Sequence, residues 1–534
     1  MTESIESPAF TAGDYRQMAE LGIAPEETRR HLELFRNPPP HTRVRHACTL
    51  GDGIRAIFPD DEPGLVARFA EAAAGGAIHK LVPASGAASR LFKALLEHLE
   101  QLERFEHGAG GPAPEPAAEV RTFFAELPRF AFFAELAAAA AARGIALEPD
   151  AAAAGAPAAT PAGRRAILAC LLAADGLGYA ERPKGLILFH RYPDGSRTPF
   201  EEHLVEAADY ARDRDGVCRL HFSVSPQHEA DFRALLAGKE AVLARRLGCR
   251  FEVTFSHQRR ATDTLAVDPA QQPFRLADGS LLFRPGGHGA LLANLQEMAD
   301  GGAGVVVLKN IDNVVPDRLK PEVTRWQRLL GGLLLALRDR TCRLLAELAS
   351  DLPDEELIEE AGRFVEFELS RQLPPGFAEA SPAEQRHVLW QALDRPLRVA
   401  GVVRNTGEPG GGPFWVESPA GEVSLQIVEA SQIGPEPDQQ AAFAASTHFN
   451  PVDVACALHD HAGRPYELDR FVDPATVFIA AKSHEGRPLQ ALERPGLWNG
   501  AMAGWNTVFV EIPNATFAPV KTILDLLRPE HQEA

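Results

Sequence analysis

A loop of small side chains between an apolar run and a helical pattern is the strongest chemical signal in the sequence. The apolar run covers residues 78–82, the loop ends at Arg90, and apolar residues at helical spacing continue from Leu91. A helix N-terminus that follows a tight loop exposes backbone N–H groups and favours negative charge. Arg90 would add a charge-assisted contact to a phosphate. The loop residues expected to bind a nucleotide are Ala84, Ser85, Gly86, Ala87, Ala88 and Ser89.

That loop has a second interpretation, because turns rich in Ala, Ser and Gly also occur where a strand only packs against a helix. Two lysines placed close to prolines favour the phosphate interpretation. Lys184 follows Pro183 directly, and Lys521 lies two residues after Pro519. A lysine fixed next to a strand suits an anionic phosphate oxygen, although an ordinary solvated lysine is the alternative at each position.

A carboxylate follows the most apolar strand that the sequence predicts. Residues 304–308 are continuously apolar, as in a buried parallel strand, and Asp312 comes after them between Asn310 and Asn313. A carboxylate at a strand end suits Mg²⁺ shared with substrate phosphates. The alternative is an Asx turn that caps the next segment.

Three glycines surround one histidine in the segment Gly286-Gly287-His288-Gly289. Glycines allow the backbone to approach a ligand closely, and a helical pattern begins at Gly289. The segment therefore favours a ligand-binding loop at Gly287, His288 and Gly289, although a lone histidine is more often structural.

The elements around these residues alternate between strand and helix. Strands are expected at 185–189, 220–224, 251–255 and 304–308, with helices at 200–210, 228–236 and 289–298. This alternation predicts an α/β fold with a doubly wound, mostly parallel sheet, where ligands bind at the carboxyl ends of strands. Four shorter strands are expected in the last third, at 423–428, 452–458, 477–480 and 507–512.

The expected domain division follows composition. An N-terminal helical region covers 1–75, and the nucleotide-binding α/β core covers 76–106 and 164–318. A helical insertion rich in Ala and Pro covers 107–163, a helical region covers 319–400, and a C-terminal α/β part covers 401–534. The seven residues Arg197 to His203 read as a capped helix start.

Charge and composition exclude several classes. The net charge of −19 disfavours duplex nucleic acid and anionic lipid as partners. No apolar run is long enough to span a membrane, and the N-terminus has no signal-peptide core. The six cysteines show no metal-ligand spacing, which is typical of a reduced, cytoplasmic protein.

Taken in order, the motifs resemble those of the sugar-1-phosphate nucleotidyltransferases, most closely the UDP-sugar pyrophosphorylase branch. The matching segments are Pro83 to Arg90, Pro183 to Gly185, Pro285 to Gly289, Asn310 to Asn313, and Phe517 to Lys521. Two weaker similarities are the strand ending at Glu429 and the pair Phe449-Asn450. The resemblance implies a core like that of GT-A enzymes and a Mg²⁺-dependent joining of a nucleoside triphosphate, UTP by this likeness, to a sugar 1-phosphate.

The resemblance also implies a role for each residue. Arg90, Lys184 and Lys521 would be the catalytic cations, with Lys184 on the α-phosphate and Lys521 on the sugar phosphate. Asp312 would hold the metal. His288 and its glycines would lie near the base. Substrate contacts would come from Asn313, Glu429 and Asn450.

The whole chain also resembles a bacterial family, domain of unknown function 4301. The supporting segments are Leu81 to Arg90, Arg197 to His203, Phe283 to Ala290 and Leu497 to Gly500. Two departures from the pyrophosphorylase pattern leave alternatives open. The first loop keeps only one glycine, which favours the alternative of a non-catalytic protein that binds a nucleotide or sugar nucleotide. Lys184 lies far beyond the loop, so Lys93 is an alternative α-phosphate lysine.

Overall fold

The computed structural model describes residues 10–86, 88–107, 112–147, 159–350, 354–419 and 421–532, with the backbone alone for Ser89. The predicted helical insertion at 107–163 lies partly outside these ranges. The chain divides into two compact units. Unit 1 comprises Met1–Ala72, Ser256–Leu308 and Arg328–Ile512, and unit 2 comprises Ala73–Phe255, Lys309–Gln327 and Pro513–Ala534.

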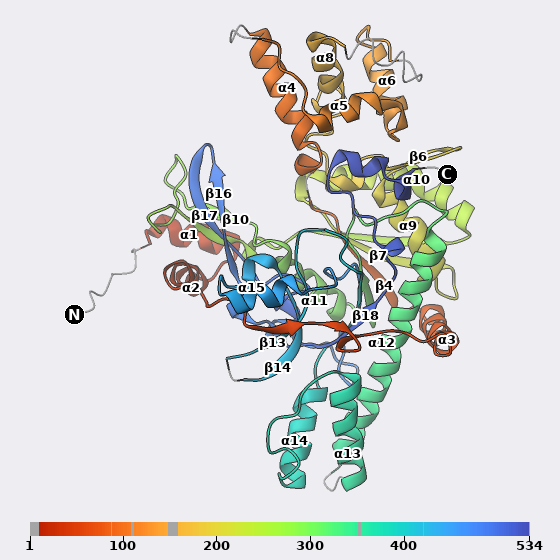
Figure 1. Cartoon of the computed structure of the whole chain (residues 1–534), viewed down its shortest axis with the longest axis vertical. Coiled ribbons are helices and arrows are strands. Elements are labelled where there is room, and N and C mark those ends of the chain that lie inside the picture. Colours follow the sequence, from red (N-terminus) through yellow and green to blue (C-terminus); the bar gives the residue numbers. More distant parts are fainter. Residues whose placement is uncertain are drawn as a thin grey trace, which may run out of the picture. The chain divides into compact units, whose positions relative to one another are not determined.

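Unit 2 contains three strands that lie side by side in the order β4-β7-β8, with β4 and β7 parallel, and a separate antiparallel pair, β5 and β6. Its strands are β4 (Ile78–Pro83), β5 (His190–Tyr192), β6 (Gly195–Arg197), β7 (Val217–Ser223) and β8 (Arg250–Ser256). Its helices are α4 (Lys93–Glu106), α5 (Ala118–Ala125), α6 (Phe133–Ala141), α8 (Pro161–Leu172), α9 (Pro199–Tyr210) and α10 (Glu229–Leu247). Helices α4, α5, α6 and α8 gather into one group around a shared apolar core (Figure 1).

Helix α9 is buried around almost its whole circumference. Water therefore cannot satisfy its first backbone amides, and the helix depends on capping side chains. Thr198 is the N-cap, its hydroxyl accepts from the Glu201 amide, and the Glu201 carboxylate accepts from the Thr198 amide. Pro199 occupies the first helical position. The predicted capped helix start is confirmed, and it presents Glu202, His203 and Glu206 to the interior.

In unit 1, six sheet strands lie in the order β2-β3-β18-β12-β15-β11. They are β2 (Thr49–Leu50), β3 (Gly53–Arg55), β18 (Asn506–Glu511), β12 (Leu397–Val402), β15 (Asp453–Ala457) and β11 (Val305–Leu308). All share one direction except β15, which is antiparallel to both of its neighbours. The predicted α/β class with a mostly parallel sheet is therefore confirmed.

Two smaller sheets complete unit 1. One is β1 (Val44–Ala47), β13 (Gly412–Glu417) and β14 (Val423–Val428), and the other is β10 (Phe283–Arg284), β9 (Thr264–Val267), β17 (Arg487–Glu493) and β16 (Phe478–His484). The remaining helices are α1 (Ala12–Leu21), α2 (Pro25–Arg36), α3 (Glu62–Ala74), α11 (Leu292–Asp300), α12 (Lys320–Leu348), α13 (Glu355–Arg363), a π-helix (Phe364–Glu368), α14 (Pro382–Leu393) and α15 (Pro437–Ala444). Helix α12, which begins in unit 2, is the long helix of Figure 1.

One local prediction was wrong. Residues 185–189 form no strand: a 3-10 turn covers Lys184–Leu186, and a Cβ on Gly185 would lie 2.9 Å from the Phe232 ring. The segment is apolar because it is buried. Strand β11 is continuously apolar as predicted and shares the direction of the parallel strands, although its partner β15 is antiparallel.

Candidate functional site

Four predicted segments, far apart in the sequence, meet in unit 2. Lys184 is the centre of this arrangement, because its Nζ donates to Asp312 Oδ2 at 2.6 Å and to the Val520 carbonyl at 2.7 Å. Its amide also approaches the Gly86 carbonyl at 3.4 Å. One lysine therefore contacts the small-residue loop, the strand-end carboxylate and the C-terminal segment.

The segment after β11 and the C-terminal segment hold one another in place. The Val520 amide donates to the Asp312 carbonyl at 3.3 Å, and the Ala518 amide donates to Asn313 Oδ1 at 3.0 Å. Asn313 is buried, so its side chain serves this contact within the protein. Asp312 remains 20% exposed and Lys184 14% exposed, so a ligand can reach the pair.

Some backbone amides of the small-residue loop already donate hydrogen bonds within the protein. The Ala84 amide donates to the Ser223 carbonyl at 2.8 Å, and the Ala88 amide donates to the Arg182 carbonyl at 3.2 Å. Across the described ranges, the amides of Ser85 and Gly86 have no acceptor. Ala87 lies outside the described residues, and nothing is described of the Ser89 side chain. The open amides at Ser85 and Gly86 are those available to a phosphate.

The other predicted cations differ in their surroundings. Arg90 is exposed at the end of a 3-10 turn (Ala88–Arg90), without an ion pair to any described residue. Lys521 is exposed, and its amide donates to Asp525 Oδ2 at 2.8 Å. Lys93 is 74% exposed and pairs with Glu97 at 3.8 Å. Of the two alternative lysines, Lys184 is the one beside Asp312.

A buried charge network that the sequence did not indicate lies behind the Asp312 segment. Glu206 accepts from Lys80 Nζ and Lys309 Nζ, both at 2.8 Å, and from Gln327 Nε2 at 2.7 Å. Burial alone would raise the pKa of Glu206, but Lys309 and Lys80 hold it well below its usual range. The sequence feature that could have indicated this network is Lys80, a lysine inside the mostly apolar segment Ile78–Pro83.

His203 connects this network to the site. Its Nε2 lies 3.2 Å from the carbonyls of both Asn310 and Ile311. Burial and the nearby charge of Lys80 lower the pKa of His203 well below its ordinary value, so the ring is neutral. A neutral ring with its proton on Nε2 donates to these carbonyls and fixes the turn that carries Asp312.

A second buried carboxylate, Glu202, is connected through His190 to His531 in the C-terminal segment. It accepts from Lys320 Nζ at 2.5 Å and from the Tyr192 hydroxyl at 2.7 Å, and it contacts His190 Nδ1 at 2.9 Å. His190 Nε2 in turn lies 2.9 Å from His531 Nδ1, with the two rings stacked. Burial and His190 lower the pKa of His531 to about 3.

In unit 1, Glu429 lies directly after β14 in a cluster of amides. Asn450 Nδ2 donates to Glu429 Oε1 at 2.8 Å, and Asn499 Nδ2 approaches the same oxygen at 3.4 Å. Among the described residues, the Oδ1 atoms of Asn450 and Asn499 have no hydrogen-bond donor. The cluster brings together Glu429 and Asn450, two of the three residues expected to contact the substrate, and adds Asn499, for which the sequence predicted no role.

The glycines around His288 are explained in part by the chain itself. A Cβ on Gly289 would lie 2.0 Å from the Pro495 carbonyl oxygen, and one on Gly286 would lie 2.7 Å from the Thr262 carbonyl oxygen. His288 Nδ1 accepts from the Leu497 amide at 3.1 Å. Burial lowers the pKa of His288, which favours the neutral ring, and because Nδ1 accepts, the proton of that ring lies on Nε2. Gly287 has a φ of 78°, which favours glycine.

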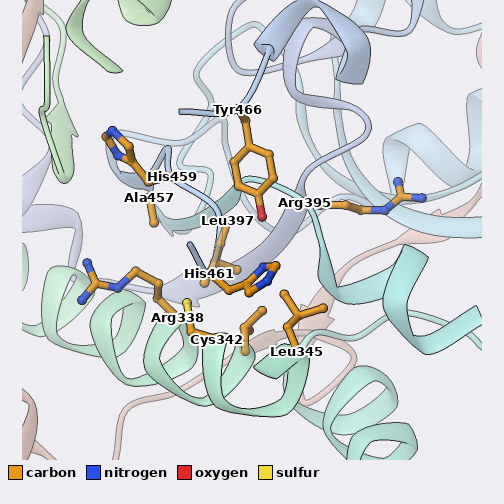
Figure 2. A pocket seen from close by; sticks show the side chains of 10 residues that line it. Arg338, Cys342, Leu345, Arg395, Leu397, Ala457, His459, His461 and Tyr466 are labelled. Atoms are coloured by element: carbon orange, nitrogen blue, oxygen red, sulfur yellow. The ribbon is translucent and has the colours of Figure 1, made fainter. Parts of the chain in front are cut away.

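A small hollow in unit 1, with room for about one water molecule, contains none of the predicted site residues (Figure 2). Its polar groups mostly serve the fold, because the Tyr466 hydroxyl donates to Asp394 at 3.0 Å and His459 contacts the Ala299 carbonyl at 3.1 Å. Arg338 and Arg395 point away from its centre to opposite sides.

The described ranges contain no group of three or more His, Cys, Asp or Glu side chains arranged to hold a metal ion. Within the same ranges, no helix has the length and apolar content needed to cross a bilayer.

Solved structures similar to this chain include UDP-sugar pyrophosphorylases. A UDP-glucose pyrophosphorylase mutant from Leishmania major, in complex with UDP-glucose, is 13% identical, with 97% of this chain and 79% of that chain covered and a TM-score of 0.43. A uridine diphosphate N-acetylglucosamine pyrophosphorylase from Trypanosoma brucei is 13% identical, with 94% and 74% covered and a TM-score of 0.44.

No curated protein matches the sequence. A family model does match it, and that match extends over residues 11–532, nearly the whole chain. The segments singled out for this family, from the small-residue loop to Leu497–Gly500, all lie inside the matched range. The chain therefore belongs to the family described as Domain of unknown function (DUF4301).

Proposed function

We propose that the protein is a nucleotidyltransferase that joins a nucleoside triphosphate, UTP by the motif resemblance, to a sugar 1-phosphate with release of pyrophosphate. The observation that carries the proposal is the meeting of four motif segments at Lys184 in unit 2. The proposed setting is the cytoplasm, which rests on the cysteine usage of the sequence.

In the proposed reaction, an oxygen of the sugar phosphate attacks the α-phosphorus, and the bond to the β-phosphate oxygen breaks. The protein must align two polyanions and neutralise growing charge. Ser85, Gly86 and Arg90 would hold the triphosphate. Lys184 would exchange Asp312 for an α-phosphate oxygen, and Lys521 would contact the sugar phosphate.

Asp312 fits a role in holding Mg²⁺. It offers one reachable carboxylate, and Mg²⁺ commonly takes one or two carboxylates with its other ligands from phosphates and water. Mg²⁺ bound there would supply positive charge to the phosphate oxygens. The resemblance gives Glu429, Asn450 and Asn313 contacts with the substrate, and gives the His288 loop contacts with the base.

The experiment is a pyrophosphate-release assay with Mg²⁺, UTP, the other nucleoside triphosphates and a panel of sugar 1-phosphates. The Asp312→Ala variant tests the site, and Asp194→Ala is a matched control, since Asp194 is a 68% exposed carboxylate in the same unit. Release that requires one sugar phosphate and is lost only in Asp312→Ala supports the proposal. Nucleotide binding without release from any pair indicates a non-catalytic binding protein instead.

A further inference from the structure

Residues 497–500, a segment that the sequence singled out for the family, follow β17 and have no role in the proposed reaction. In unit 1 this segment contacts both the His288 loop and Glu429. The Leu497 amide donates to His288 Nδ1 at 3.1 Å, and the rings of Trp498 and His288 have their centres 4.7 Å apart. The segment therefore joins the loop assigned to the base to the carboxylate assigned to the sugar.

Gly496 shows how closely this segment packs. A Cβ on Gly496 would lie 2.8 Å from His288 Nε2 and 2.9 Å from Asn499 Oδ1. A larger residue would push the histidine ring or Asn499 aside, so the position requires glycine. Direct packing therefore sets the spacing between the His288 loop and Asn499.

Asn499 is only 2% exposed, and its side-chain amide faces the end of β14. Its Nδ2 donates to the Ile427 carbonyl at 3.3 Å and approaches Glu429 Oε1 at 3.4 Å. Asn450 Nδ2 donates to the same carboxylate oxygen at 2.8 Å. Two amide groups from separate segments thus hold one oxygen of Glu429.

The Glu429 carboxylate is half-buried and makes no ion pair with any residue that the structure describes. It accepts hydrogen bonds only from amides there, those of Asn450, Asn499 and the backbone of Gln432. A carboxylate has about four acceptor positions, so capacity remains for a ligand. A carboxylate that is not neutralised by a cation is a strong acceptor for neutral donors such as sugar hydroxyls.

We propose that Asn499 is a positioning residue, which holds the Glu429 carboxylate in the orientation that accepts from the sugar hydroxyls of the substrate. The inference rests on the proposed function for the assignment of Glu429 to the sugar. Asn499 acts through Glu429, whereas the contact with His288 comes from the Leu497 amide. Asn499 therefore determines the contribution of the sugar to binding and not that of the nucleotide.

The test is calorimetric titration of the full chain with UDP and with UDP-glucose, UDP-galactose and UDP-N-acetylglucosamine. Asn499→Ala should weaken binding of the tightest UDP-sugar about tenfold and leave UDP binding within about twofold. Asn499→Asp keeps the size of the side chain but replaces the donor next to Glu429 with a charged acceptor, and should weaken UDP-sugar binding at least as much. In a Glu429→Ala background, Asn499→Ala should change binding less than about twofold, because both act through one contact.

Asn506→Ala is the matched control. Asn506 is 3% exposed in unit 1, and its Nδ2 donates to the Ala392 carbonyl at 3.0 Å, without contact to a carboxylate in the described part of the chain. It should lower the melting temperature about as much as Asn499→Ala and leave UDP-sugar binding unchanged.

Three results would overturn the role of Asn499. They are equal UDP-sugar binding by Asn499→Ala and the natural protein, an equal loss in Asn506→Ala, and no binding of any UDP-sugar at about 10 mM. Failure of the proposed function is separate, since it appears as UDP-sugar binding without pyrophosphate release from any substrate pair. The role of Asn499 would then hold for a sugar-nucleotide binding protein.

Discussion

Unit 2 holds lysine–carboxylate pairs of the same chemistry in three different surroundings. Lys80 and Glu206 lie 2.8 Å apart and are 0% and 1% exposed, whereas Lys184 and Asp312 lie 2.6 Å apart and are 14% and 20% exposed. Lys93 and Glu97 lie 3.8 Å apart on the surface of α4. Exposure decides what such a pair can do: a ligand can open the second pair, but solvent and ligand are excluded from the first.

The sealed pair also differs in the number of its partners. Glu206 is contacted by two lysines and a glutamine, so each buried charge is compensated within the protein. The Lys184–Asp312 pair instead lies next to the open amides of the small-residue loop. We infer that the sealed network fixes the shape of unit 2, and that the reachable pair serves the chemistry.

The largest expected effect comes from breaking the sealed network. Glu206→Gln leaves Lys80 and Lys309 buried without a carboxylate, and should lower the free energy of unfolding by about 3–5 kcal/mol. Urea denaturation measures the loss. The triple variant Lys80→Met, Glu206→Leu, Lys309→Met should recover most of it, because the network then contains no charged side chain. A loss below about 1 kcal/mol in Glu206→Gln would contradict the sealed role.

Breaking the reachable pair should reduce turnover strongly and change stability little, the opposite of breaking the sealed network. Lys184→Ala should lower turnover by a factor on the order of 10² to 10³, while the free energy of unfolding changes by about 1 kcal/mol or less. Steady-state pyrophosphate release and urea denaturation are measured on the same preparation. Full turnover in Lys184→Ala would remove this lysine from the proposed mechanism.

A second buried contact, His190 with His531, should appear as a pH dependence of stability. The pKa of His531 falls from an ordinary value of 6.5 to about 3, first because of burial, so the folded protein rejects a proton that the unfolded chain binds. Stability should therefore decrease as the pH falls below 6.5, by up to about 1.4 kcal/mol per pH unit for this one proton.

His531→Phe should reduce that slope by one proton, measured as the free energy of unfolding between pH 7 and 4. His107→Phe provides the control, because His107 is exposed at the end of α4. Identical slopes in His531→Phe and the natural protein would show that His531 titrates normally in the folded state.

The sequence singled out both residues of the reachable pair, each for its own role, but not the sealed network. Lys184 and Asp312 stand in short motifs whose proline, asparagine and strand-end context mark them. Lys80 and Glu206 are 126 residues apart, and neither has a local pattern that names its partner. The glycines around His288 show another limit. The sequence indicated that something approaches them closely, but it could not indicate that the backbone of Pro495, from a distant segment, is what approaches Gly289.

Prediction of the strands and helices from the sequence was limited in a similar way. Apolar runs located β4, β7 and β11 because burial dictates composition, and capping residues located the start of α9. Composition could not distinguish the buried 3-10 turn at Lys184–Leu186 from a strand, nor reveal that β15 runs against its neighbours. Both depend on contacts with residues distant in the sequence.

The smallest expected effect closes the comparison of the three pairs. Lys93→Ala removes an exposed pair spaced four residues apart on α4, and such pairs contribute about 0.3–0.5 kcal/mol. Turnover in the pyrophosphate-release assay should stay within about twofold of the natural protein, because Lys93 contacts neither Asp312 nor Val520. A drop comparable to that of Lys184→Ala would instead make Lys93 the phosphate-binding lysine, and exposure would then fail as the criterion that separates a surface pair from a functional one.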